Sequence, residues 1–354
     1  MVTLIARPLA WEEKTLTVLR TRQLEICQKD LLSFPARSLF DPEATDADAE
    51  VLYDLSWDAL ESRRLNPMRR GETRLHTLEE LRERVSGQFS REMALLSPEE
   101  HTLLARAAIF GGETMLTDSG EMYPARGLVR RLFCRFDQEK GRLILPQMLR
   151  VRALMTLTED SHRQAQEALE PFNDSVDNTL YLWGVLQADA PLSRLRELFR
   201  GTPIEGDDTL YLRYLTATWA HIRTASGQLF LVHPGVAEPE RLLEQYDRSP
   251  LRNALMSIPE ESLQEASIAV DELETPLYDQ LLGLIGEDTR PELDPEDTVE
   301  DMILLAKQDA PEEAMARILN ATLIRPASED ALRALSRLRE LVPRWLSLSA
   351  SLLQ

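Results

Sequence analysis

Apolar residues recur at helical spacing along most of this 354-residue chain, whereas the alternation typical of strands is scarce. Two segments of the sequence each predict the residue at which a helix begins. In Ser97-Pro98-Glu99-Glu100, Ser97 can cap the helix, Pro98 suits its first position, and Glu100 can accept a hydrogen bond from the cap backbone. Asp294-Pro295-Glu296-Asp297 combines a cap, a proline and acids at the positive end of the helix dipole. The sequence therefore predicts a mostly α-helical fold.

Short strands interrupt the helices at two places. The sequence predicts a helix ended by Gly111-Gly112, an amphipathic helix over 124–136, a turn ending at Gly141, a strand over 142–145 and a helix through Leu157. This order is that of a winged-helix unit. A similar order follows, with helices over 178–187, 192–200 and 208–224, a turn at Gly227 and a strand over 228–232. We therefore predict two related winged-helix-like units with short β-hairpins.

The rest of the chain is predicted to be helical. Short helices are expected over 259–266 and 275–285, and further helices start at Asp294 and after Ala310 and cover 328–341. The predicted domains are a helical amino-terminal region over 1–95, which includes a helix over 9–32, winged-helix-like units over 96–175 and 176–257, and a carboxyl-terminal helical region over 258–354.

Charge is distributed unevenly around a net value of −20. Residues 201–310 hold 23 acidic and 7 basic residues, whereas the segment 124–152 holds eight basic residues and two acidic ones. Two electrostatic faces of opposite sign are therefore expected. The candidate contacts to nucleic acid or a partner are Arg126, Arg130, Arg131, Arg135, Lys140 and Arg142. The candidate acidic partner surface consists of Glu287, Asp288, Glu292, Glu296, Asp297, Glu300 and Asp301.

The basic segment admits two interpretations. On a helical wheel, its arginines lie opposite an apolar arc that contains Leu128 and Phe133, as in a recognition helix followed by a wing that contacts phosphate. Alternatively, the arginines form the solvent face of an amphipathic helix or pair with the acidic half of the chain. The strong overall acidity argues against nonspecific binding to nucleic acid.

No known catalytic or metal motif is found. The two cysteines, Cys27 and Cys134, are far apart, no two of the five histidines have metal-ligand spacing, and no phosphate loop or nucleophile elbow occurs. Cys134 is predicted to be an unreactive packed thiol, although neighbouring arginines would favour the thiolate if it were accessible. We expect no enzymatic activity, no cofactor and no metal.

Several segments together resemble a group of bacterial helical proteins of unknown function with Rho-amino-terminal-like and SEC-C-associated architecture. They are Leu75–Val85, Leu96–Glu100, Gly127–Phe133, Leu143–Leu149 and Leu182–Leu186. The similarity covers roughly residues 50–300 and implies helical architecture but no activity. The end of the chain, SLSASLLQ, lacks the clustered Cys and His of a SEC-C metal motif, so no zinc role is expected.

The functional hypothesis is a non-enzymatic interaction or regulatory protein that binds a macromolecular partner, with a basic protein as one such partner. The alternatives are a winged-helix protein that binds nucleic acid through 124–152, and an acidic inhibitor that imitates nucleic acid through 201–310. No stretch has the roughly 20 apolar residues of a membrane helix and no apolar signal core begins the chain, so the cytoplasm is the predicted location. The sequence leaves the oligomeric state open.

Overall fold

The structure is a computed structural model that describes residues 31–35, 37–56, 77–117, 120–224, 226–236, 239–248, 260–291 and 293–345. The described residues form two compact units, which we describe separately. Unit 1 comprises the described residues of 173–191 and 219–345, and unit 2 those of 31–172 and 192–218. The chain thus passes from unit 2 to unit 1, back to unit 2 and again to unit 1. The predicted four-part division stays a prediction.

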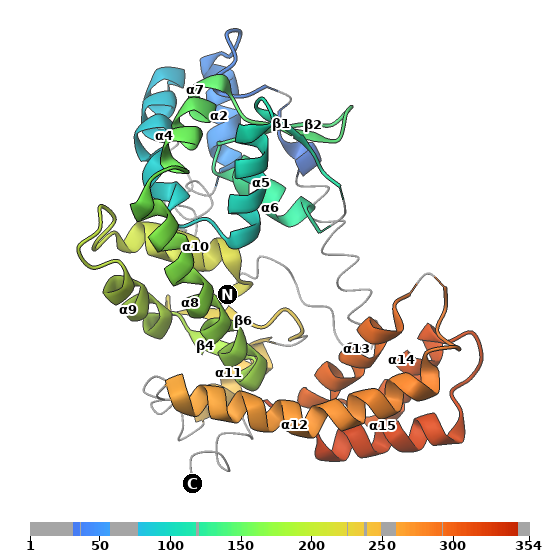
Figure 1. Cartoon of the computed structure of the whole chain (residues 1–354). Helices are drawn as coiled ribbons and strands as arrows, with labels where there is room; N and C mark the ends of the chain where they lie inside the picture. Colours follow the sequence, from blue (N-terminus) through green and yellow to red (C-terminus); the bar gives the residue numbers. More distant parts are fainter. Residues whose placement is uncertain are drawn as a thin grey trace. The chain divides into compact units, whose positions relative to one another are not determined.

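The mostly helical fold with short β-hairpins is confirmed (Figure 1). The helices are α2 (Asp46–Leu55), α4 (Leu78–Met93), α5 (Pro98–Ile109), α6 (Met122–Arg130), α7 (Gln147–Thr156), α8 (Asp160–Trp183), α9 (Asp189–Leu198), α10 (Asp208–Thr218), α11 (Pro239–Arg248), α12 (Glu260–Ile285), α13 (Pro295–Lys307), α14 (Glu312–Thr322) and α15 (Glu329–Leu341). The strands are β1 (Glu113–Met115), β2 (Arg135–Asp137), β3 (Arg142–Ile144), β4 (Val185–Gln187), β5 (His221–Arg223) and β6 (Leu229–Val232).

Both predicted helix starts are confirmed. Ser97 accepts a hydrogen bond from the backbone N–H of Glu100, whose carboxylate accepts one from the N–H of Ser97, so that a capping box opens α5. Asp294 caps α13 by accepting from the N–H of Glu296. These local bonds satisfy donors that a helix leaves free at its first turn, which explains why four residues suffice to predict the start.

The two sheets share one topology. In each, three antiparallel strands are ordered so that the third in sequence lies between the first and the second, giving β1-β3-β2 and β4-β6-β5. The predicted strands over 142–145 and 228–232 are confirmed as β3 and β6, the central strand of each sheet. The outer strands were not predicted, and 178–187 and 208–224, expected to be helical to their ends, finish instead in β4 and β5.

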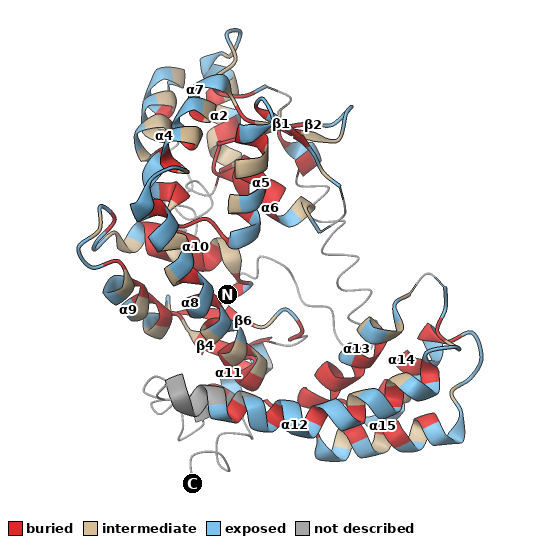
Figure 2. Cartoon of the chain, in the orientation of Figure 1, coloured by how far each residue is buried: buried red, intermediate tan, exposed pale blue. Residues whose placement is uncertain are grey.

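A buried core in unit 2 surrounds α5. It includes Phe89 of α4, Leu104 of α5, Leu128 of α6, Phe133 and Leu143, and the rings of Phe89 and Phe133 meet edge to face with centroids 4.6 Å apart. In unit 1, helices α12 to α15 bury their apolar sides against one another and expose their charged sides (Figure 2). The expected break between short helices at 259–266 and 275–285 is wrong, because α12 is continuous through Pro276.

Candidate functional site

The helix α6 ends six residues earlier than predicted, and this changes the environment of its arginines. Leu132 follows the helix with a φ of 62°, in the left-handed region. The N–H groups of Leu132 and Phe133 donate to the carbonyls of Val129 and Leu128, which is the Schellman pattern of helix termination with leucine in the usual glycine position. Arg135 and Phe136, the last two residues of the predicted helix, therefore belong to β2. A single helical wheel over 124–136 does not describe the directions of these side chains.

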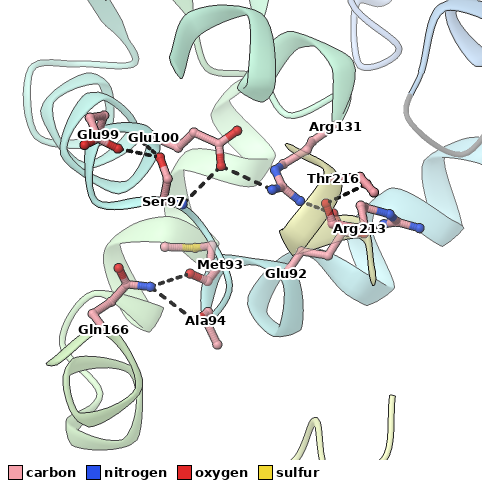
Figure 3. A network of polar contacts seen from close by, with 10 residues as sticks. All are labelled: Glu92, Met93, Ala94, Ser97, Glu99, Glu100, Arg131, Gln166, Arg213 and Thr216. Atoms are coloured by element: carbon pink, nitrogen blue, oxygen red, sulfur yellow. Dashed lines mark hydrogen bonds and ion pairs between the residues drawn. The ribbon is translucent and has the colours of Figure 1, made fainter. Parts of the chain in front are cut away.

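Arg131 is buried between two carboxylates instead of facing solvent. Its Nη2 lies 3.2 Å from Glu100 Oε2, and its Nη1 lies 3.6 Å from Glu92 Oε2 (Figure 3). Its side chain is only 1% exposed. Glu92 also accepts from Arg213 of α10 at 2.5 Å, so one carboxylate of α4 joins arginines from two later segments of the chain. Gly127 makes room for this arrangement, because a Cβ there would overlap the carboxylate of Glu100.

Arg130 is also buried. It donates from Nη1 to the carbonyl of Leu55 at 3.1 Å, and its guanidinium lies 5.8 Å from the ring centroid of Phe34. The hypothesis that Arg130 and Arg131 contact an external nucleic acid or protein surface is therefore corrected. Side chains enclosed in the core cannot reach the phosphate backbone of a duplex.

The remaining predicted basic contacts do not form one exposed face. Arg126 is partly buried, Lys140 is exposed, and Arg135 lies 4.0 Å from Asp41. Arg142 donates to Asp137 at 3.0 Å and pairs with Glu113 on the neighbouring strand. Hydrogen bonds from Arg142 lower the pKa of Asp137. The acids that these two arginines contact, Asp41, Glu113 and Asp137, lie outside the acidic segment 201–310 that the alternative named.

A small pocket in unit 2 is lined by arginines that are far apart in the sequence. Its cavity volume is about 10 Å³, room for about one water molecule, and four of its nine lining residues are arginines. The lining residues are Ser56, Arg84, Val85, Gln88, Glu92, Arg130, Arg131, Leu132 and Arg213. The lining thus contains four arginines and one glutamate, and the arginines come from α4, the end of α6 and α10. Such a lining attracts anions.

Unit 1 contains a buried polar cluster that joins three helices. Nζ of Lys307 in α13 lies 2.6 Å from Oε1 of Glu274 in α12 and 4.1 Å from the ring centroid of Tyr181 in α8, whose hydroxyl donates to Glu274. Burial lowers the pKa of Lys307 and raises that of Tyr181. Trp345 extends this cluster by donating from Nε1 to the carbonyl of Tyr181 at 2.9 Å and from its backbone to Lys307. The Lys307 side chain is fully enclosed.

The predicted acidic surface is only partly a surface. Glu287, Glu296 and Glu300 are exposed, Asp297 is partly exposed, and Asp288 pairs with Arg325. Asp301 is completely buried on the inner side of α13, so its assignment to the surface is corrected. Glu292 lies outside the described residues.

Cys134 is buried, and burial raises its thiol pKa, as expected of a packed thiol. The other cysteine, Cys27, lies outside the described residues. Among the described residues, no three His, Cys, Asp or Glu side chains gather closely enough to hold a metal ion. Within the same residues, no helix is both long and apolar enough to cross a membrane.

Two histidines form a pair in unit 2, in which His162 is buried and His101 is partly buried. Nε2 of His101 in α5 and Nε2 of His162 in α8 are 3.0 Å apart, and the rings are stacked with centroids 5.1 Å apart. Such a hydrogen bond needs one nitrogen as donor and the other as acceptor, so both rings can be neutral. Burial lowers the pKa of both histidines, and the neighbouring His101 adds to the effect on His162, whose pKa falls to about 4.

This pair predicts a loss of stability in mild acid. The unfolded chain takes up a proton near the ordinary histidine pKa, whereas folded His162 resists protonation, so stability is complete above that value and falls as the pH falls. Between pH 7 and pH 5, His162 should contribute a loss of about 2 kcal/mol in the free energy of unfolding. Denaturant unfolding followed at both pH values measures it. His162→Gln, which keeps a hydrogen-bonding side chain but does not titrate, should reduce the loss; an unchanged loss would contradict the assignment.

Comparison with protein-family models, with curated proteins and with solved structures found no match to this chain. The resemblance to bacterial helical proteins of unknown function therefore stays a prediction.

Proposed function

We propose that this protein is a non-enzymatic interaction or regulatory protein of the cytoplasm and that it binds a macromolecular partner through the exposed face of α7. The observation that carries the proposal is an apolar stripe on that helix. Met148, Val151 and Met155 follow one another at helical spacing and are 47%, 50% and 64% exposed. Leu149 and Ala153 occupy the buried side of the same helix.

Two arginines hold α7 in this orientation. Arg150 donates to the carbonyl of Ala108 in α5, and Arg152 donates to the carbonyl of Ser86 in α4. Because α7 packs against both of these helices (Figure 1), its apolar stripe cannot turn inward without breaking both contacts. Ile109 and Phe110, at the end of α5, are also largely exposed. Exposed apolar groups of this kind are typical of protein-binding surfaces, and methionine adapts its shape to a partner.

Sheet topology supports the further proposal that the units are winged-helix-like. The central position of the third strand is shared by both sheets, and each sheet's first and second strands are separated in sequence by helix. One helix, α6, separates β1 from β2, whereas α9 and α10 separate β4 from β5. Many winged-helix units bind proteins, which agrees with a partner on α7 better than with a duplex on α6.

A paired substitution tests the α7 surface. Met148→Glu/Met155→Glu should abolish capture of specific partners from a native-host lysate and any self-association seen by sedimentation. Leu284→Glu/Ile324→Glu, which alters two exposed apolar side chains in unit 1, is the matched control. Thermal unfolding should show that both variants fold. If the α7 variant retains every association of the wild type, this face is not the binding surface.

A second candidate function follows from the acids of α12 and α13. Glu296 and Glu300 are exposed on α13. Burial raises the pKa of Tyr278, and the charges of Glu296, Glu300, Asp294 and Asp279 raise it further. A surface of this charge favours a basic partner, including a protein that normally binds nucleic acid.

The acidic surface predicts a salt-dependent association. Glu287→Lys/Glu296→Lys should slow binding to a basic partner several-fold at low salt, with less effect on dissociation, because long-range charge acts mainly on the association rate. Surface plasmon resonance at several salt concentrations measures both rates. Glu329→Lys/Asp330→Lys, at the exposed start of α15, is the matched control. Equal association rates for wild type and the first variant would restrict the acids to a solubility role.

A further inference from the structure

We propose that the exposed face of α7 binds an acidic amphipathic helix of a partner protein. The proposal rests on the function proposed above and names the chemistry of the partner. Residues 140–158, which include the whole of α7, hold four basic residues and no acidic one, within a chain whose net charge is −20. The face of α7 therefore differs in sign from most of the chain.

The apolar stripe has the length of about two helical turns. Met148, Val151 and Met155 span seven positions, which is about 10 Å at a rise of about 1.5 Å per residue. Ile109 and Phe110, which are 62% and 71% exposed, add apolar surface at the end of α5, a helix that packs against α7. Apolar side chains at this spacing are complementary to the apolar face of a second helix.

The positive charges of α7 are not paired with acids of the described residues. Arg150 donates to the carbonyl of Ala108 and to the side-chain oxygen of Gln147. Arg152 donates to the carbonyl of Ser86. These acceptors are uncharged, and among the described residues neither arginine has a carboxylate within ion-pair distance. Arg152 is exposed and lies four residues after the start of the stripe, so its charge adjoins the apolar side chains.

The surroundings of α7 do not cancel this charge. Its contact with α4 includes a hydrogen bond from the hydroxyl of Thr156 to that of Ser90, which is uncharged. In the sequence, acids follow the stripe only at Glu159 and Asp160, and Asp160 pairs with Arg163 of α8. Positive potential beside an apolar stripe favours a partner helix that carries carboxylates beside its own apolar residues.

Two designed peptides test the charge of the partner against the full chain. Each forms an amphipathic helix of about 18 residues with leucine on one face, and the polar face carries glutamate in the first peptide and glutamine in the second. Fluorescence anisotropy measures both affinities at several salt concentrations. The glutamate peptide should bind about tenfold more tightly than the glutamine peptide at low salt, and the difference should shrink as salt rises. Because the whole chain is acidic, only a local basic face can produce this preference.

A pair of variants locates the binding. Gln147→Glu/Thr158→Glu adds two carboxylates at exposed positions of the α7 region and leaves both arginines in place. It should weaken binding of the glutamate peptide about tenfold. Gln280→Glu/Thr275→Glu makes the same two replacements at exposed positions of α12, gives the same net charge, and is the matched control. An equal loss in both variants would assign the effect to overall charge and overturn the proposal.

Arg152→Gln provides a second reading should the first α7 variant fail to fold. It removes the exposed charge next to the stripe and should also weaken binding of the glutamate peptide, with little effect on the glutamine peptide. Thermal unfolding shows which variants fold. Unchanged affinity for the glutamate peptide in a folded Arg152→Gln variant would overturn the proposal.

Further outcomes separate this proposal from the function proposed for α7. Equal affinity for the two peptides would overturn the acidic partner, whereas α7 would remain a binding surface if Met148→Glu/Met155→Glu still abolishes capture of partners. Self-association of the wild type that this double variant abolishes would identify a second copy of the chain as the occupant. Binding to phosphatidylserine vesicles without saturable binding of the glutamate peptide would identify a membrane. Either finding would overturn the acidic helix as the partner.

Discussion

Replacement of Arg131 by methionine is expected to lower the free energy of unfolding by about 3–5 kcal/mol. The substitution removes a cation that is in contact with two buried carboxylates, Glu92 and Glu100. Glu92 retains Arg213, but among the described residues the Glu100 carboxylate keeps only its capping hydrogen bond from the backbone N–H of Ser97. The cost comes chiefly from leaving Glu100 charged and enclosed, because a buried pair as a whole contributes little net stability.

Chemical denaturation measures this loss. Arg163→Met is the matched control, since Arg163 is 67% exposed and its ion pairs with Asp160 and Glu167 lie in solvent. Its effect should stay below about 1 kcal/mol. Adding Glu100→Gln to Arg131→Met should recover part of the loss by removing the isolated charge. If Arg131→Met is no more destabilising than Arg163→Met, the network is not enclosed as described.

Replacement of Glu274 by glutamine is expected to destabilise unit 1 by a similar amount, about 3–5 kcal/mol. The substitution removes the counter-charge that contacts Lys307 in the core and leaves the ring of Tyr181 and the more distant charge of Asp271 near the ammonium group. Burial already lowers the pKa of Lys307, so the isolated lysine should lose its proton in the folded state. The variant should therefore regain stability as the pH rises toward the ordinary lysine pKa of about 10.4.

The control for this experiment lies on the same helix. Glu272→Gln changes an exposed carboxylate of α12 two residues away and should alter stability little. The double variant Glu274→Leu/Lys307→Met replaces the whole pair by apolar groups and should be more stable than Glu274→Gln alone. A Glu274→Gln variant as stable as the Glu272→Gln control at neutral pH would show that Lys307 does not depend on this partner.

Helix starts were predictable from sequence because each depends on a few neighbouring residues. The ends of helices were less predictable from sequence. Leu132 follows α6 in the left-handed backbone conformation that glycine usually adopts. A leucine side chain gives no sign in the sequence that a helix ends there. Pro276 and Pro171 lie inside α12 and α8, where packing along long helices outweighs a local cost of about 3 kcal/mol. The outer strands have three residues each, too few for an alternation to be recognised.

The pocket could not be predicted as a whole, because its residues are separated by up to about 160 positions in the sequence. One local signal was nevertheless available. Leu81, Val85 and Phe89 form the apolar stripe of α4, and Glu92 continues it at helical spacing. Arg213 likewise occupies the buried side of α10 beside Leu210. A charge at a core position needs a buried partner, so such residues indicate enclosed ion pairs. The helical wheel over 124–136 instead predicted that the side chains of Arg130 and Arg131 face solvent.

The alternation of the chain between its units sets an order for folding during synthesis. The last segment of unit 2 ends at Thr218, after the ribosome has already released the first segment of unit 1. Unit 1 can be completed only after Trp345 is synthesised, because the indole and backbone N–H groups of Trp345 donate hydrogen bonds to the carbonyls of Tyr181 and Lys307. At about 5–20 residues per second, these roughly 130 residues take about 6–25 s to translate. During that interval, residues 173–191 lack the contacts that Trp345 and Lys307 make with Tyr181 in the folded unit 1.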